Sequence, residues 1–160
     1  MHIIWVSLLY FGGFLESGNK GGLRVNEPEL IQQLLRSKSI AVIGLSDNPE
    51  KPSHYVPAFL QSVGHRIIPV NPGIEFVLGE KAYASLTELP TKPDLVNVFR
   101  LPKFIPAIVD EMIALGLPAI WVQQGLMHPE AAKKAEAHGI QVVMDRCIMV
   151  ESRAAGVKLS

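Results

Sequence analysis

The sequence contains almost no cysteine, no excess of charge and no long apolar run. A single cysteine among 160 residues excludes an internal disulfide framework and leaves no cysteine cluster for a structural zinc site. Lysine and arginine together number 15, as do aspartate and glutamate, so the basic footprint of a nucleic-acid-binding protein is missing. No apolar run reaches the ~20 residues that span a bilayer. We therefore expect neither a nucleic acid nor a membrane as partner.

The sequence is rich in apolar residues, which make up 48% of it, and its length fits one globular domain. Residues 1–15 are nearly all apolar, but they lack the positively charged start and the small-residue cleavage site of a secretory signal. A linker-like stretch, SGNKGG, follows at residues 17–22. We therefore expect a cytoplasmic protein with a non-core extension at residues 1–25 and one folded domain at residues 26–160.

The apolar pattern of that domain alternates between strand and helix periods. Short apolar runs predict strands at residues 40–43, 67–70, 95–99, 119–122 and 141–144. Amphipathic spacing predicts helices at residues 26–36, 53–63, 105–113 and 129–138, the first of them capped by Asn26. Pro69 cannot donate to a ladder, so it is expected either on an edge strand or at the end of a strand. This alternation predicts a single doubly wound, Rossmann-like α/β domain, a five-stranded parallel sheet with helices on both faces.

Ligands of such folds bind outside the carboxyl ends of the strands, where the strand order reverses. The loop after the first strand has residues suited to a phosphate. Gly44 permits a tight turn, Lys51 supplies charge, and the helix that opens near Ser53 points its free N–H groups at the loop. Ser46 and Asn48 can donate hydrogen bonds. The loop matches neither G-x-G-x-x-G nor the Walker pattern, so an ordinary strand-to-helix connection explains it equally well.

The end of the second strand argues against NAD as the ligand. Val70, Asn71 and Pro72 stand where an NAD-binding domain has a carboxylate for the ribose hydroxyls. A nucleotide with phosphates elsewhere remains open. Cations that follow strand ends predict a local positive site in a neutral chain. These cations are Lys51, Arg100, Lys103 and Arg146. Ordinary surface solvation is the alternative for each of them and the favoured interpretation for Lys103.

Five short motifs, taken together and in order, resemble a known family. They are GLSxxPxKPS from residue 44, IPVNP from residue 68, VFR from residue 98, WVQxG from residue 121 and MDRCI from residue 144. Their combination resembles the small stand-alone CoA-binding proteins of bacteria and archaea. These proteins are similar to the CoA-binding Rossmann domain of the succinyl-CoA synthetase α subunit. The resemblance covers about residues 39–150.

The resemblance implies CoA or an acyl-CoA as the ligand. It places the phosphates on the first loop, the adenosine between the second and third strand ends, and the pantetheine arm along the fourth. The residues implied for the phosphates are Gly44, Leu45, Ser46 and Lys51. Those implied for the adenosine are Val70, Asn71 and Pro72 on one side and Phe99, Arg100 and Leu101 on the other. Those implied for the pantetheine arm are Gln124 and Gly125. Asp47 departs from the synthetase loop, which has glycine there, and a carboxylate beside phosphates is unfavourable unless it points away. The synthetase's second domain, with its phosphorylated histidine, has no counterpart here, so ligase activity is not implied.

No independent catalytic constellation stands out. The five histidines share no metal-ligand spacing, and the nucleophile motif G-x-S-x-G is absent. Cys147 lies beside Arg146, and a neighbouring cation favours the reactive thiolate, so thiol exchange with CoA is one hypothesis and a buried, inert cysteine is the other.

We therefore expect a non-enzymatic CoA-binding protein that acts as a carrier, sensor or accessory protein. Two alternatives stay open. One is a small nucleotide-dependent enzyme, either an oxidoreductase or an acyl-CoA-handling protein, and the other is a structural domain that has lost its ligand. The apolar run of Ile148, Met149 and Val150 fits either the edge of the core or a contact with a second copy or another protein.

Overall fold

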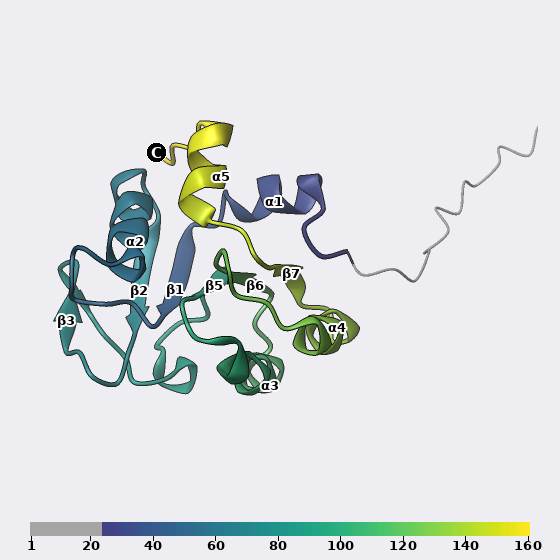
Figure 1. Ribbon diagram of the computed structural model, residues 1–160. Helices are drawn as coiled ribbons and strands as arrows, with labels where there is room; N and C mark the ends of the chain where they lie inside the picture. The colour runs from purple at the N-terminus through teal and green to yellow at the C-terminus, as the bar shows by residue number, and fades with distance from the viewer. Residues whose placement is uncertain (1–23) are drawn as a thin grey trace, which may run out of the picture.

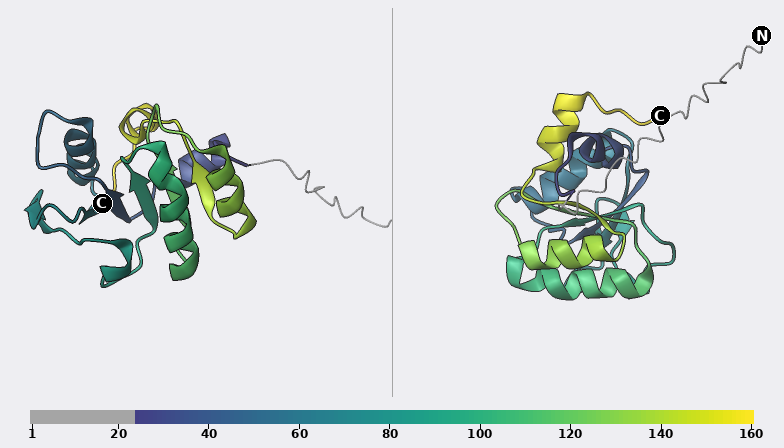
Figure 2. Two further views of the ribbon diagram at one scale, coloured as in Figure 1. Left: turned by 60° about the horizontal axis from the view of Figure 1, so that its bottom comes forward. Right: turned by 90° about the vertical axis from the view of Figure 1, so that its right-hand side faces the viewer.

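The computed structural model describes residues 24–160, which form three layers (Figure 1; Figure 2). The middle layer is a parallel sheet with strand order β2-β1-β5-β6-β7. Its strands are β1 (Ser39–Ile43), β2 (Arg66–Val70), β5 (Leu95–Val98), β6 (Ala119–Val122) and β7 (Gln141–Val143). The predicted five-stranded Rossmann-like fold is confirmed, and β2 lies at an edge, which is one of the two positions expected from Pro69. Most of the expected extension, residues 1–23, lies outside the described residues.

Helices cover both faces of the sheet (Figure 2). One face carries α3 (Ile105–Leu115) and α4 (Pro129–Ala137), and the other carries α1 (Pro28–Leu34), α2 (Pro52–Ser62) and α5 (Ile148–Ala155). A cluster of buried apolar side chains lies between each helical layer and the sheet, so burial on both faces holds the three layers together. Among residues 24–160, no helix combines the length and apolarity needed to cross a bilayer.

Several short elements were not predicted from the sequence. They include the hairpin of β3 (Phe76–Val77) and β4 (Glu80–Lys81), two 3₁₀ turns, η1 (Leu86–Glu88) and η2 (Pro102–Phe104), and helix α5. The buried face of α5 consists of only Ile148 and Ser152, a stripe too narrow to give a clear helical period. Ile148 belongs to the core, whereas Val150 is 55% exposed.

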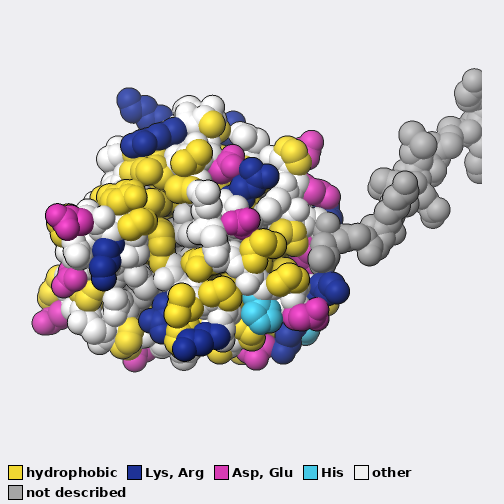
Figure 3. All heavy atoms as spheres, viewed as in Figure 1, with side chains coloured by type: hydrophobic (Ala, Val, Ile, Leu, Met, Phe, Trp, Pro, Cys, Tyr) yellow, Lys and Arg dark blue, Asp and Glu magenta, His cyan; other side chains and the backbone are white. Residues whose placement is uncertain are grey.

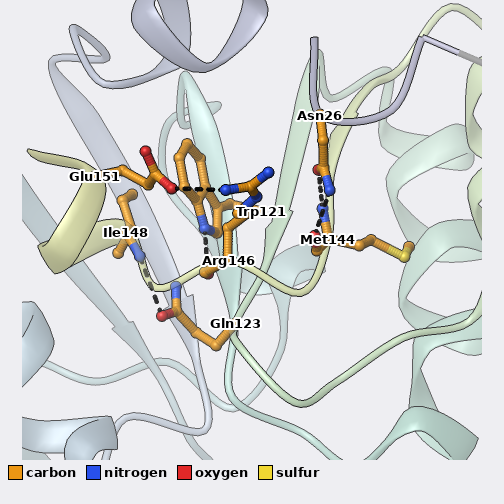
Figure 4. Close-up of polar contacts among 7 residues, drawn as sticks. All are labelled: Asn26, Trp121, Gln123, Met144, Arg146, Ile148 and Glu151. Carbon is orange, nitrogen blue, oxygen red and sulfur yellow. Dashed lines mark hydrogen bonds and ion pairs between the residues drawn. The ribbon is translucent and has the colours of Figure 1, made fainter. Parts of the chain in front are cut away.

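The prediction that Asn26 caps the first helix is wrong. Helix α1 begins at Pro28 without a side-chain cap, and Asn26 has a φ of 63°. Its side chain instead donates to the carbonyl oxygen of Met144 and accepts from the Met144 N–H, both at 2.8 Å (Figure 4). Because β7 is an edge strand, the backbone that follows it lacks a neighbouring strand to hydrogen-bond with. The Asn26 side chain supplies these hydrogen bonds and is therefore not used to cap α1. Val25 also packs against the core, and the domain boundary at residue 26 stays a prediction.

His65 gives the fold a specific pH dependence. His65 is 3% exposed, its Nδ1–H donates to the carbonyl oxygen of Ser37 at 2.6 Å, and Nε2 has no partner in the part of the chain that the structure describes. Burial lowers the pKa of His65 below its ordinary value. Below about pH 6.5 the unfolded chain therefore binds more protons than the native one, and stability falls by at most about 1.4 kcal/mol per pH unit until the native pKa is passed.

We expect His65→Asn, which keeps a donor for Ser37, to lose less stability than the wild type between pH 7 and pH 5. Thermal unfolding at both pH values measures this difference. The matched control is His138→Asn, which removes an exposed histidine that also contacts a backbone carbonyl. Equal pH dependence in the two variants would contradict the prediction.

Candidate functional site

The strand order reverses between β1 and β5, and the loops that follow these two strands meet there. Gly44 ends β1 with a φ of +83°, and a Cβ on it would lie 3.2 Å from the carbonyl oxygen of Phe99 and 3.3 Å from Cδ of Arg100. Only glycine combines this conformation with such a close approach. The first and third predicted site segments therefore lie in contact at this switch point between the ends of β1 and β5, which we call the crevice.

A proline inside α2 fixes the loop between β1 and α2. Pro57 has no N–H, so it leaves the carbonyl oxygen of Ser53, four residues earlier, without its usual helical partner. The N–H of Ser46 donates to this oxygen at 3.1 Å. His54 adds a second link, because its Nδ1–H donates to the carbonyl oxygen of Ser46 at 2.7 Å. The loop is thus held from within the helix that follows it.

The same loop keeps hydrogen-bond donors available for a ligand. Oγ of Ser46 accepts from the N–H of Asn48 at 3.1 Å, and Oδ1 of Asn48 accepts from the N–H two residues further on at 3.0 Å. These bonds use acceptor groups, so the Ser46 hydroxyl proton and the Asn48 NH₂ group stay free to donate. The backbone N–H groups of Leu45, Asp47 and Ser53 also have no partner within the described residues. Asp47 is exposed, so its carboxylate is solvated.

Two cations flank the crevice without a carboxylate partner. Lys51 and Arg100 are exposed and belong to no ion pair in the region from residue 24 onward. Arg146, which the sequence placed in the same positive set, instead pairs with Glu151 at 3.3 Å. In the space-filling view, basic and hydrophobic side chains lie side by side along the lower rim of the molecule (Figure 3).

Several predicted site residues already have structural roles. The side chains of Leu45 and Val70 are buried in the core, so only their backbone could meet a ligand. Asn71 uses both ends of its amide, since Nδ2 donates to the carbonyl oxygen of Leu45 at 3.0 Å and Oδ1 accepts from the N–H of Gly73 at 2.9 Å. Asn71 therefore joins the end of β2 to the β1 loop, and the neighbouring Pro72 stays exposed.

The remaining predicted residues form a second group at the ends of β6 and β7. The N–H of Gly125 donates to Oδ1 of Asp145 at 2.7 Å and ties the two loops together. A cavity of about 370 Å³ opens beside them. Its lining includes Gln124, Cys147, Val150 and the ion pair of Arg146 with Glu151. The structure thus places the half-buried Cys147 in one cavity with Gln124.

Sequence reasoning missed a polar network that holds the start of α5 (Figure 4). Trp121 Nε1–H donates to the carbonyl oxygen of Arg146 at 2.8 Å, and the N–H of Ile148 donates to Oε1 of Gln123 at 3.3 Å. This second bond orients the Gln123 amide, whose NH₂ group donates to Oδ1 of Asn97. Asn97 Nδ2 is left without a partner among the residues that the structure places. The network joins β5, β6 and α5 between the two groups of site residues.

Comparison with known proteins decides the family. A family model described as a CoA binding domain matches residues 38–153, which is most of the chain. The chain belongs to this CoA binding domain family. The resemblance inferred from the five motifs is therefore confirmed, and membership supports CoA binding in general.

Relatives of this CoA binding domain include small proteins and parts of larger enzymes. YneT of Bacillus subtilis is 44% identical over 125 residues, 78% of this chain and 93% of YneT. A solved structure from Thermus thermophilus has a TM-score of 0.72 at 40% identity and covers 79% of this chain and 93% of that chain. An ADP-forming acetate–CoA ligase of Archaeoglobus fulgidus is 24% identical over 74% of this chain, but the match spans only 19% of the ligase.

Proposed function

We propose that this domain binds coenzyme A or an acyl-CoA in the crevice between the ends of β1 and β5. We further propose that it acts in the cytoplasm as a carrier, sensor or accessory protein and catalyses no reaction. The observation that carries the proposal is the Gly44 turn. It brings together backbone N–H groups, the Ser46 hydroxyl, the Asn48 amide and two cations that have no carboxylate partner among residues 24–160. Family membership supports CoA as the ligand.

The phosphates fit the β1–α2 loop. The Ser46 hydroxyl, the Asn48 amide and the N–H of Ser53 can donate to them, and Lys51 supplies the charge. Ser53 lies in the first turn of α2, where the helix dipole favours an anion. The hydrogen bonds of Ser46 to Ser53 and His54 hold the loop in place, so binding costs little ordering entropy.

The other parts of CoA fit the two groups of site residues. The adenosine fits between the exposed Pro72 and the β5 end, where Phe99, Arg100 and Leu101 lie. The pantetheine arm fits along Gln124 and Gly125, toward the cavity that Cys147 lines. NAD fits less well, because Asn71 stands in place of the ribose-binding carboxylate and both ends of its amide already have a partner.

Thermal shift with CoA and with NAD(H) tests the proposed function. A ligand at a hundredfold excess over its Kd stabilises the native state by about 2.7 kcal/mol. We expect CoA but not NAD(H) to raise Tm, and Lys51→Ala and Arg100→Ala to reduce the response. Lys158→Ala, which removes an exposed lysine near the C-terminus, serves as the control. A shift with NAD(P)H alone would favour an oxidoreductase, and no shift with either nucleotide would favour a purely structural domain.

A further inference from the structure

Arg100 is held in a defined position at the mouth of the crevice. Its Cδ lies 3.3 Å from where a Cβ of Gly44 would be, and its guanidinium carbon lies 4.3 Å from the centroid of the Phe104 ring. The N–H of Phe104 donates to the carbonyl oxygen of Leu101 at 2.9 Å, and this turn brings the ring back toward Arg100. The side chain of Arg100 thus extends from the β1 turn to an aromatic ring.

This arrangement leaves part of Phe104 exposed and uses none of the Arg100 guanidinium N–H groups in a hydrogen bond among the described residues. Phe104 is 36% exposed, and Lys103 Nζ lies 5.1 Å from the centroid of its ring. Neither Arg100 nor Lys103 belongs to an ion pair with any carboxylate of residues 24–160. A guanidinium fixed on a ring keeps its N–H groups and a planar surface for a ligand, at a low entropic cost of ordering. Neighbouring cations without a counter-ion favour an anion.

We propose that Arg100 and Phe104 form a stacking platform that recognises the phosphorylated adenosine of the ligand and not its thiol end. Planar bases stack on aromatic rings and on arginine guanidinium groups, and the cations Arg100 and Lys103 attract phosphate carried by the ribose of the adenosine. The exposed side chain of Leu101 adds apolar contact beside the platform. This inference rests on the proposed function and adds Phe104 and Lys103 to the site.

Calorimetric titration with three probes tests the inference. The probes are CoA, adenosine 3′,5′-bisphosphate, which lacks the pantetheine arm, and 4′-phosphopantetheine, which lacks the adenosine. We expect Phe104→Leu to raise the Kd for CoA and for the bisphosphate about tenfold and to leave the Kd for phosphopantetheine unchanged. Arg100→Lys keeps the charge but loses the planar group, so it gives a smaller change with the same pattern.

Phe76→Leu is the matched control, because Phe76 is 63% exposed on β3 and belongs to no cation–aromatic pair in the described chain. It should bind all three probes as the wild type does. Wild-type affinity of Phe104→Leu for the bisphosphate, or an equal loss for phosphopantetheine, would overturn the platform. The platform also falls if the wild-type protein binds CoA and phosphopantetheine but not the bisphosphate, while the proposed function stands. If the wild type binds none of the probes, the proposed function fails and the platform with it.

Discussion

Gly44→Ala is expected to lower the affinity for CoA about tenfold or more, a loss of about 1.4 kcal/mol in binding free energy for each tenfold step. The added Cβ would lie 3.2 Å from the carbonyl oxygen of Phe99, so the end of β5 must move away from the β1 turn. The positive φ of Gly44 also costs a non-glycine residue about 1–2 kcal/mol of folding stability. Titration with CoA measures the first effect, and denaturant unfolding measures the second.

Gly139→Ala separates these two causes. Gly139 has a φ of +78°, close to that of Gly44, but a Cβ on it would meet nothing within 4 Å, and it follows α4 away from the crevice. This variant should lose stability and keep its affinity for CoA. If both alanine variants bind CoA as the wild type does, the close approach of the β1 turn to β5 has no part in recognition.

Oxidised CoA is expected to label Cys147. In this exchange the Cys147 thiolate attacks one sulfur of CoA disulfide, a new S–S bond joins the protein to one CoA, and the other CoA leaves as a thiolate that takes up a proton. The expectation rests on the shared cavity of Cys147 and Gln124, which places the cysteine where the pantetheine arm would end. Intact-mass spectra should show one CoA adduct, reversible by dithiothreitol and absent in Cys147→Ser.

The rate of labelling distinguishes a directed reaction from accidental oxidation. If the nucleotide binds first, CoA disulfide should label Cys147 faster than cystamine does, because cystamine lacks a nucleotide. Arg100→Ala should slow the reaction with CoA disulfide and leave the cystamine reaction unchanged. Equal rates for the two disulfides in the wild type would show that the nucleotide does not direct the reaction. No adduct at all would show that the half-buried Cys147 is unreactive.

The sequence predicted the large elements of the fold because their apolar spacing is strong. Helical spacing of Ile105, Val109 and Met112 predicts α3, and continuous apolar runs predict the buried strands β5 and β6. Few other secondary structures fit these patterns. It failed where a distant partner decides a local conformation. Asn26 is a good helix cap by composition, but the backbone of Met144, more than a hundred residues away in the chain, binds its side chain. No local pattern contains that information.

The same distinction applies to the candidate site. The predicted strand ends were enough to place Gly44, Lys51 and Arg100 near one another, because topology alone sets the carboxyl edge of a parallel sheet. Whether a polar group at that edge is free for a ligand depends on neighbours from other loops. The amide of Asn71 and the N–H of Gly125 looked available in the sequence, but both already have partners in the structure.

The missing N–H of Pro57 affects how a substitution away from the surface can change ligand recognition. Pro57 is buried within α2, yet it decides which group the carbonyl oxygen of Ser53 accepts from. Any other amino acid at position 57 would bring an amide proton that competes with Ser46 for this oxygen. Evolution or a protein engineer could thus retune the ligand preference of the crevice through one interior position, without altering a single side chain on its surface.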